Sequence, residues 1–330
     1  MIDDIRNTGV EPDKDTFAIL ARSRAAHGDV PGALQALEDA VSRHSYNPIL
    51  QGLAAVGDYN SANLVYQTMK GREVEADVST FCALFYSVSS ATKRPPKISE
   101  TRNGFAGGNR HWHAQAVRDF RREMRATEPL LLEWESDMQK LGLRHTDKSL
   151  EMMMQALGNI GSWRVMLERM KAGKREGLIN ARSYNHAIFI LAKHGFLKQA
   201  QLLRRDMEAA GFKSCTVTFS GLLAGRGRIM GRQKAEGIFK EMRRSGVTPD
   251  MRIYNKMIRV CLENDDVDAA KSYLREAEGL GFAPDYFTWS VFAAEAARIG
   301  DTETMCWAVP KARASSRDPS RYVPPAEFLE

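Results

Sequence analysis

The fold is decided by residues 251–285, which read MRIYNKMIRVCLENDDVDAAKSYLREAEGLGFAPD. Apolar residues near the start of this stretch have the i, i+3, i+4, i+7 spacing of one helix face: Tyr254, Met257, Ile258 and Cys261. Asp265 and its neighbour then interrupt the pattern, and a second apolar stripe runs from Ala270 to Ala277. Aspartate suits the cap of a following helix, and Gly281 suits the left-handed residue that ends one. The stretch therefore predicts a helical hairpin.

The same pattern recurs with a period of 35 residues. An aromatic residue followed by a small polar residue marks each copy: Tyr184-Asn185, Phe219-Ser220, Tyr254-Asn255 and Trp289-Ser290. Glycine shares another place in the copies: Gly211, Gly246 and Gly281. A common period of this length is typical of stacked units that each bury an apolar face on the next. Because no alternating apolar pattern indicates a sheet, we predict an all-α solenoid.

Weaker copies occupy the amino-terminal part of the chain, where Tyr46-Asn47 and Phe81-Cys82 lie 35 residues apart. Prolines and glycines after Ala91 then break the register. We predict amino-terminal repeats over 1–91 (the first partial), a flexible basic insertion over 92–110, degenerate helical repeats over 111–180, four regular repeats over 181–309 and an extended tail over 310–330. Residues Met1 to Asp13 resemble the second half of a repeat, which favours a processed chain or an incomplete gene model.

The composition indicates a folded protein and leaves several partners open. Hydrophobic residues make up 43% of the chain, which argues against wholesale disorder. The net charge of +6 permits an acidic partner such as nucleic acid without requiring one. No apolar run approaches the roughly 20 residues of a membrane-spanning helix. Four isolated cysteines favour a reduced intracellular compartment over a disulfide or zinc framework, and no secretion signal or transit peptide is visible.

No catalytic pattern is present in the sequence. It contains neither a phosphate-binding glycine loop, nor a His-Glu-x-x-His pair, nor a nucleophile elbow. His111 and His113 are close together, but no further metal-type ligands lie nearby. We therefore expect a protein that is not an enzyme and that uses no cofactor, metal or small-molecule substrate.

Hairpins of 35 residues, with aromatic-Asn near the start and Gly-x-x-Pro-Asp at the end, resemble the pentatricopeptide repeat family. The resemblance is strong over 181–309, good over 43–91 and poor between. The related tetratricopeptide repeat is one residue shorter and lacks the terminal Pro-Asp. The resemblance implies a right-handed superhelical solenoid that binds single-stranded RNA along its first helices, in a mitochondrion or chloroplast.

In that family the fifth and last residues of each repeat contact the base edge, and the second residue packs against the base. The resemblance carries these base contacts onto Asn47, Asp77, Asn185, Ser220, Asp250, Asn255, Asp285 and Ser290. An Asn-Asp pair favours uracil and a Ser-Asp pair favours guanine, and the repeats run along RNA from 5′ to 3′. The Ser220 repeat followed by the Asn255 repeat therefore implies a 5′-GU-3′ step. The second place is usually a branched apolar residue, and this chain departs from that with arginine in two repeats and phenylalanine in another.

A stripe of cations is predicted on the same face from helix geometry alone. Residues three and four apart share one side of a helix, so the second, fifth, ninth and thirteenth places line up. The cations expected to contact the RNA backbone or stack on bases are Arg182, Lys193, Arg228, Arg252, Arg259 and Arg298. The family resemblance adds Val217, the branched apolar residue at the second place, as a residue that packs against a base. A basic ribbon with small polar groups suits phosphates and exposed bases. The competing interpretation is a solvated helix face.

Three functions are compatible with these observations. The first is a non-catalytic single-stranded RNA-binding protein that acts in organelle RNA processing, stability or translation. The second is a structural subunit of a large ribonucleoprotein, such as an organelle ribosome, in which the solenoid binds both protein and RNA. The third is a protein-binding helical scaffold, because similar folds serve unrelated functions.

Overall fold

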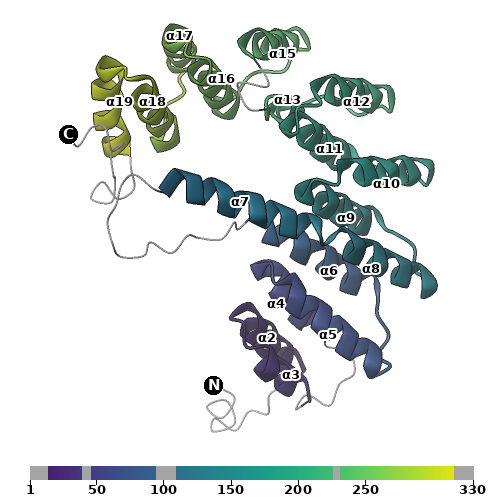
Figure 1. Ribbon diagram of the computed structural model, residues 1–330. Coiled ribbons are helices and arrows are strands. Elements are labelled where there is room, and N and C mark those ends of the chain that lie inside the picture. The colour runs from purple at the N-terminus through teal and green to yellow at the C-terminus, as the bar shows by residue number, and fades with distance from the viewer. Residues whose placement is uncertain (1–13, 39–45, 94–108, 226–230, 316–330) are drawn as a thin grey trace. The chain divides into compact units, whose positions relative to one another are not determined.

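The computed structural model describes residues 14–38, 46–93, 109–225 and 231–315 (Figure 1). The described part of the chain is built of helices and contains no strand, so the predicted all-α fold is confirmed. The helices fall into two units, Met1–Ser183 and Tyr184–Glu330, which are considered separately. The half-repeat expected before residue 14 lies outside the described residues, as do 94–108 of the insertion and 316–330 of the tail.

The first unit stacks helical hairpins. Its helices are α2 (Lys14–Ala26), α3 (Val30–Glu38), α4 (Tyr46–Val56), α5 (Tyr59–Gly71), α6 (Val78–Ala91), α7 (Asn109–Arg125), α8 (Glu128–Lys140), α9 (Asp147–Ile160) and α10 (Trp163–Arg175). Helices α2, α4, α6 and α9 pack on one another in that order and are the first helices of four hairpins. The second helices are α3, α5, α8 and α10 (Figure 1).

The insertion in this unit extends beyond the predicted boundary at residue 110. Helix α6 packs against α8, which is its second helix, so the inserted segment also includes α7. Helix α7 has a helical pattern like that of the repeats, so the sequence alone does not distinguish it from a repeat helix. Residues 147–180 then form an ordinary hairpin, in which the Thr146 side chain caps α9 and buried Leu150 replaces the aromatic residue.

The second unit contains the regular repeats. Its helices are α11 (Ala181–Lys193, whose first turn belongs to the first unit), α12 (Leu197–Ala209), α13 (Thr216–Leu222), α15 (Arg232–Arg244), α16 (Met251–Glu263), α17 (Val267–Gly279), α18 (Tyr286–Ile299) and α19 (Thr302–Ser315). They pair in sequence order as first and second helices, with the first helices on one side of this unit (Figure 1). Helix α13 ends at Leu222, well before the thirteenth place of its repeat.

The tail predicted to be extended from residue 310 is helical as far as Ser315. Pro310 lies inside α19, although proline removes a backbone donor from a helix. The helix continues because Val309 and Ala312 are buried against α18. The Lys311 ammonium group also lies 4.5 Å from the ring centroids of both Trp289 and Trp307.

The aromatic residues that recur every 35 residues, at the fourth position of each repeat, lie in the core, as predicted. Tyr184, Phe219 and Tyr254 are at most 1% exposed, and Trp289 is 5% exposed. Burying such a side chain contributes about 1.5–3 kcal/mol, so this row supplies much of the stability of each junction. No helix in the described ranges is long and apolar enough to cross a membrane.

The turns explain why the hairpins close where they do. Gly57, between α4 and α5, has a φ of 80°, and a Cβ there would lie 2.6 Å from the backbone nitrogen of Ala91. Asp265 takes the corresponding left-handed conformation between α16 and α17, with a φ of 60°. Asparagine and aspartate tolerate this region better than other side chains do, and the Asp265 carboxylate accepts a hydrogen bond from Arg298 at 2.6 Å.

Candidate nucleic-acid interface

The predicted base-contacting asparagines lie on first helices and are anchored by the following repeat. Oδ1 of Asn47 accepts a hydrogen bond from the Thr80 hydroxyl at 2.8 Å. In the second unit, Oδ1 of Asn185 accepts from Thr218 and Oδ1 of Asn255 accepts from Thr288, each at 2.7 Å. In every case the threonine is the third residue of the next repeat. These threonines were not predicted as site residues, although the period places each of them directly before the core aromatic residue.

The predicted last-place aspartates are N-caps of the next first helix. Backbone N–H groups of Thr80, Ile253 and Thr288 donate to Asp77, Asp250 and Asp285 respectively, at 2.8–3.0 Å. Asp77 also accepts from Nδ2 of Asn47 at 3.1 Å, which joins the fifth and last places of one repeat directly. Burial acts to raise the pKa of Asp77, but hydrogen bonds from Thr80 and Asn47 outweigh it and hold that pKa below its usual value.

The hairpin of α9 and α10 supplies two further residues at the last place. Thr146 caps α9 and ends the repeat that begins with α6, so it pairs in register with Cys82. Asn180 ends the α9 repeat, and its Oδ1 accepts from the backbone N–H of Ser183 at 3.0 Å. Neither residue was predicted from the sequence, because the irregular spacing of residues 147–180 hides their repeat register.

The two predicted serines have different surroundings from the asparagines. The third place after the Ser220 repeat is Ile253, which has no hydroxyl group, and the backbone oxygen of Ser220 instead accepts from Nζ of Lys256 at 2.5 Å. The Ser290 hydroxyl donates to the backbone oxygen of Phe287 within its own helix at 2.9 Å. Neither serine is linked to a neighbouring repeat through its hydroxyl group in the described residues.

The second places lie at the exposed starts of the first helices. Val217 is 52% exposed and Phe287 is 53% exposed, so both offer apolar surface to a partner. Arg182 and Arg252 occupy this place in two other repeats and are also exposed. The side chain of Arg252 pairs with Oδ2 of Asp250 at 2.8 Å, which brings the second place of one repeat onto the last place of the previous one.

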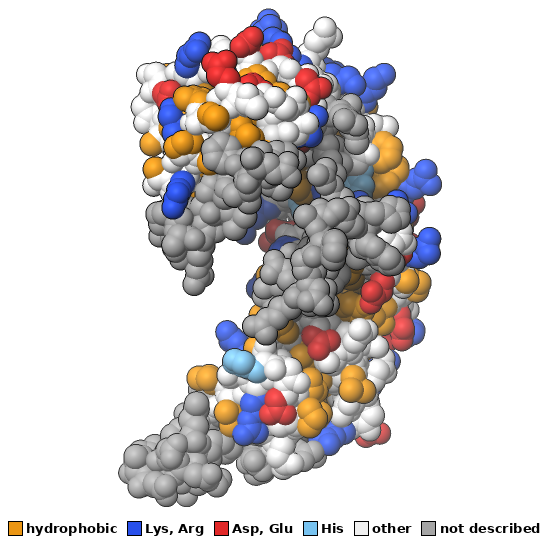
Figure 2. Space-filling model, turned by 60° about the vertical axis from the view of Figure 1, so that its left-hand side comes forward, with side chains coloured by type: hydrophobic (Ala, Val, Ile, Leu, Met, Phe, Trp, Pro, Cys, Tyr) orange, Lys and Arg blue, Asp and Glu red, His pale blue; other side chains and the backbone are white. Residues whose placement is uncertain are grey.

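The predicted basic ribbon carries less free positive charge than its sequence suggests. Arg298 pairs with Asp265 at 2.6 Å and with Glu295 at 2.5 Å, and Arg259 lies 3.7 Å from Glu263. Lys193 lies over the ring of Phe189, 5.8 Å from its centroid, and Arg228 is outside the described residues. On the face shown in Figure 2, lysines and arginines are likewise interspersed with acidic and apolar side chains.

Lys256 is a cation of this face that the sequence analysis missed. It lies between Arg252 and Arg259 at the four- and three-residue spacings of one helix face. Burial, together with the positive charges of Arg259 and Arg252, lowers the pKa of Lys256 to about 8. Lys256 therefore changes charge near neutral pH, whereas the arginines stay protonated.

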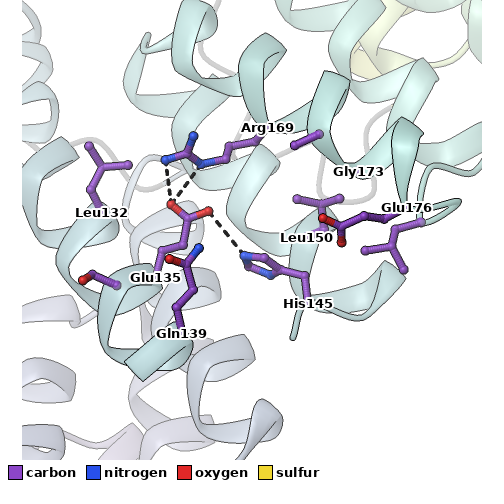
Figure 3. Close-up of a pocket in the computed structure, with 11 residues that line it drawn as sticks. Leu132, Glu135, Gln139, His145, Leu150, Arg169, Gly173 and Glu176 are labelled. Carbon is purple, nitrogen blue, oxygen red and sulfur yellow. Dashed lines mark hydrogen bonds and ion pairs between the residues drawn. The ribbon is translucent and has the colours of Figure 1, made fainter. Parts of the chain in front are cut away.

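The first unit also has a cavity of about 340 Å³ between α8, α9 and α10 (Figure 3). Within it the buried Glu135 carboxylate pairs with Arg169 at 2.7 Å and lies 3.5 Å from Nε2 of His145. Burial acts to raise the pKa of Glu135, but His145 and Arg169 outweigh it and lower that pKa. Because Glu135 comes from α8 and Arg169 from α10, this cluster joins two successive second helices. No group of three or more metal-type ligands occurs among the described residues.

Comparisons with known proteins agree with this architecture. The family profile of the pentatricopeptide repeat domain matches residues 202–264, and the PPR repeat profile matches 182–212 and 252–282. A chloroplastic pentatricopeptide repeat-containing protein of Arabidopsis thaliana is 24% identical over 135 residues, which are 40% of this chain and 17% of that protein.

Solved structures share the fold. The crystal structure of the pentatricopeptide repeat protein PPR10 with an 18-nt psaJ RNA element gives a TM-score of 0.53 at 15% sequence identity. A triple cysteine-to-serine variant of PPR10 with the same RNA gives the same values. The match covers 95% of this chain and 47% of the PPR10 chain, so the present chain spans about half the length of PPR10. The matched profiles identify pentatricopeptide repeats within residues 182–282, and the solved structures share the helical-repeat fold of the chain.

Proposed function

We propose that the chain is a non-catalytic protein that binds single-stranded RNA along its first helices. The observation that carries this proposal is the contact between Asn47 and Asp77, whose side chains are joined at 3.1 Å. They are the fifth and last residues of one repeat, and together they present an amide and a carboxylate at a repeat junction. Such a pair offers both a donor and an acceptor to a base edge. The RNA in the PPR10 crystal structures supports the same class of partner.

The side chains around the fifth- and last-place residues suit an extended strand of RNA. Exposed Val217 and Phe287 offer apolar surface on which a base can pack, because every base has a flat π-face. Arg182 and Lys256 supply positive charge for phosphates beside the base-contacting positions. Single-stranded RNA exposes its base edges, whereas the deep major groove of duplex RNA does not admit side chains.

The biological setting that we propose is RNA processing, stability or translation in an organelle. The Arabidopsis relative is named as chloroplastic, which supports a chloroplast, and the family resemblance also extends to mitochondria. We also propose that other proteins of a ribonucleoprotein assembly bind the same chain, on surfaces that do not include the base-contacting residues.

The test is binding of the purified chain to single-stranded RNA, duplex RNA and single-stranded DNA of one sequence. We expect single-stranded RNA to bind most tightly, with an affinity that falls as salt rises. The Asn47→Ala, Asn185→Ala and Asn255→Ala triple variant should lose base preference and retain most non-specific affinity. Equal binding of all three nucleic acids, or none, would contradict the proposal. Sequencing of RNA that co-purifies with the native protein would then identify the transcript.

A further inference from the structure

The repeat junctions contain a recurrent hydroxyl group whose position suggests more than a structural role. Thr80, Thr218 and Thr288 each donate to the Oδ1 atom of the asparagine in the previous repeat, at 2.7–2.8 Å. Each threonine is 33 residues after its asparagine, and each is at most 2% exposed. The same pair of atoms therefore meets at junctions in both units of the chain.

An asparagine side chain has two chemically different ends, an NH₂ group that donates and an oxygen that accepts. When a buried hydroxyl group donates to the oxygen, rotation of the amide would break this bond. The hydroxyl groups of Thr80 and Thr288 would then have only the cap aspartate as acceptor, at 3.0 Å from Asp77 and 2.9 Å from Asp285. Such loss of a buried hydrogen bond is unfavourable. The hydroxyl group therefore holds the amide in one orientation and leaves Nδ2 as the end available to a ligand. At Asn47 the same orientation allows Nδ2 to donate to Asp77.

We propose that Thr80, Thr218 and Thr288 are positioning residues, which fix the polarity of the base-contacting asparagine across each repeat junction. This inference rests on the proposed function. With Nδ2 toward the base, the amide donates to a base acceptor such as a uracil carbonyl oxygen. A rotated amide would instead present its oxygen and accept from the amino group of cytosine. The threonine thereby favours uracil over cytosine without touching the RNA.

The chain contains an internal contrast for this role. The third place after Ser220 is Ile253, which is fully buried and has no hydroxyl group. A serine hydroxyl rotates freely and serves as donor or acceptor, so it has no polarity that needs fixing. At these junctions, a repeat with asparagine at its fifth place is succeeded by a repeat with threonine at its third place. The repeat with Ser220 at its fifth place is succeeded by one with an apolar residue at its third place.

The test removes the hydroxyl group of Thr288 and retains its shape. Thr288→Val keeps the backbone N–H that donates to Asp285 at 2.9 Å and caps the helix, and it removes the hydroxyl contact with that carboxylate, also at 2.9 Å. We expect the preference of the Asn255 repeat for uracil over cytosine to fall by about 2- to 12-fold, the range for one neutral hydrogen bond. The salt dependence of binding should not change. Thr288→Ser keeps the hydroxyl group and should restore the preference.

Thr304→Val is the matched control. Thr304 is equally buried and has the same cap bond, from its backbone N–H to Asp301 at 3.0 Å, but it lies in the second helix α19. We expect this variant to keep the wild-type base preference. If Thr288→Val is unstable, Thr288→Ala removes the same hydroxyl group without placing an extra methyl in the core, and the same loss of preference is expected.

A second readout needs no RNA. The Asn255 side-chain NH₂ group should have a high order parameter in the wild type and in Thr288→Ser, where χ2 is fixed, and a lower one in Thr288→Val, where the amide rotates about χ2. A Thr288→Val protein with unchanged base preference, or one that loses affinity equally for all bases, overturns this assignment alone. A wild-type chain that binds no RNA overturns the proposed function and this assignment with it.

Discussion

The guanidinium group of Arg252 lies 2.8 Å from Oδ2 of Asp250, so a second-place residue neutralises the last-place carboxylate of the previous repeat. Asp250 shares its repeat with Ser220, and Lys256 donates to the backbone oxygen of that serine at 2.5 Å. The Ser220 repeat therefore has two cations beside its base-contacting residues, an arrangement that does not occur around Asn47 in the described residues. We expect this relationship to affect both base preference and phosphate binding.

The first prediction is that Arg252→Val separates these two contributions. Removing the arginine frees Oδ2 of Asp250 as an acceptor and restores a branched apolar residue at the second place. We expect guanine preference at the Ser220 repeat to rise by about 1.5- to 5-fold, the scale of an exposed ion pair. The slope of log K against log salt should fall by about 0.7. Binding to RNAs that differ at this base measures both quantities, and a fall in guanine preference would show that Arg252 itself contacts the base.

The second prediction concerns the base order. The Ser220 and Asn255 repeats together should select a 5′-GU-3′ step, because a short hydroxyl leaves room for a purine and the longer amide reaches a pyrimidine. Asn255→Ser should shift the second base from uracil toward guanine by about 1–3 kcal/mol, by analogy with direct base readout elsewhere. Selection from a random RNA pool measures this shift. No GU enrichment in the wild type, or no shift in the variant, would refute it.

The third prediction concerns phosphate binding. Replacing Arg182, Arg228, Arg252 and Arg298 together by alanine should weaken binding to all RNA sequences and flatten its salt dependence, by about 0.7 in slope for each lost phosphate contact. Because Arg298 is paired with Asp265 and Glu295, Arg298→Ala alone should change the slope less than Arg182→Ala alone.

The control for this prediction is a pair of exposed arginines on second helices, Arg205 and Arg275. Their replacement by alanine removes two charges away from the first-helix face, and it is compared with the double replacement of Arg182 and Arg252 by alanine. An equal loss of slope in this control would mean that binding responds to net charge and not to the predicted ribbon.

The fourth prediction is a pH dependence that comes from Lys256. Its pKa is lowered to about 8 in the folded protein, whereas an unfolded lysine has a pKa of about 10.4. Between these values the unfolded chain binds more protons, so the contribution of Lys256 to the free energy of unfolding rises as the pH rises from 8 to 10. Lys256→Met should remove that rise. Denaturant unfolding of both proteins across this pH range measures it, and parallel curves would contradict the prediction.

The fifth prediction concerns the Glu135 cluster. The lowered pKa of Glu135 means that its contribution to stability is present above the unfolded pKa of about 4.3 and is lost as the pH falls through the lower folded value. Glu135→Gln should destabilise the protein at neutral pH by about 1–3 kcal/mol, because the half-buried guanidinium group of Arg169 loses its charged partner.

The matched control is Glu176→Gln. Glu176 lines the same cavity but is exposed, so its replacement should change stability little. Acid unfolding of the three proteins separates the two residues. If Glu176→Gln destabilised the protein as much as Glu135→Gln, the effect would belong to the cavity as a whole and not to the ion pairs.

The sequence by itself determined the helical repeat and its core. The period of 35 residues predicted the buried row of Tyr184, Phe219, Tyr254 and Trp289, because an aromatic residue at one place of every hairpin has only the neighbouring hairpin to pack against. The cap residues could also be predicted, since an aspartate bonds to backbone N–H groups within its own turn. Both features depend on contacts that are local or separated by one repeat.

Only the tertiary structure decided which polar groups meet across repeats and where the repeat is interrupted. The pairing of Thr288 with Asn255, and of Arg298 with Asp265, depends on how one hairpin is rotated against the next, and spacing alone does not give that rotation. The helix α7 has the periodicity of a repeat helix, so only the packing of α6 on α8 shows that it is inserted. Pro310 predicts a helix end, but burial of Ala312 against the preceding helix outweighs the missing backbone hydrogen bond.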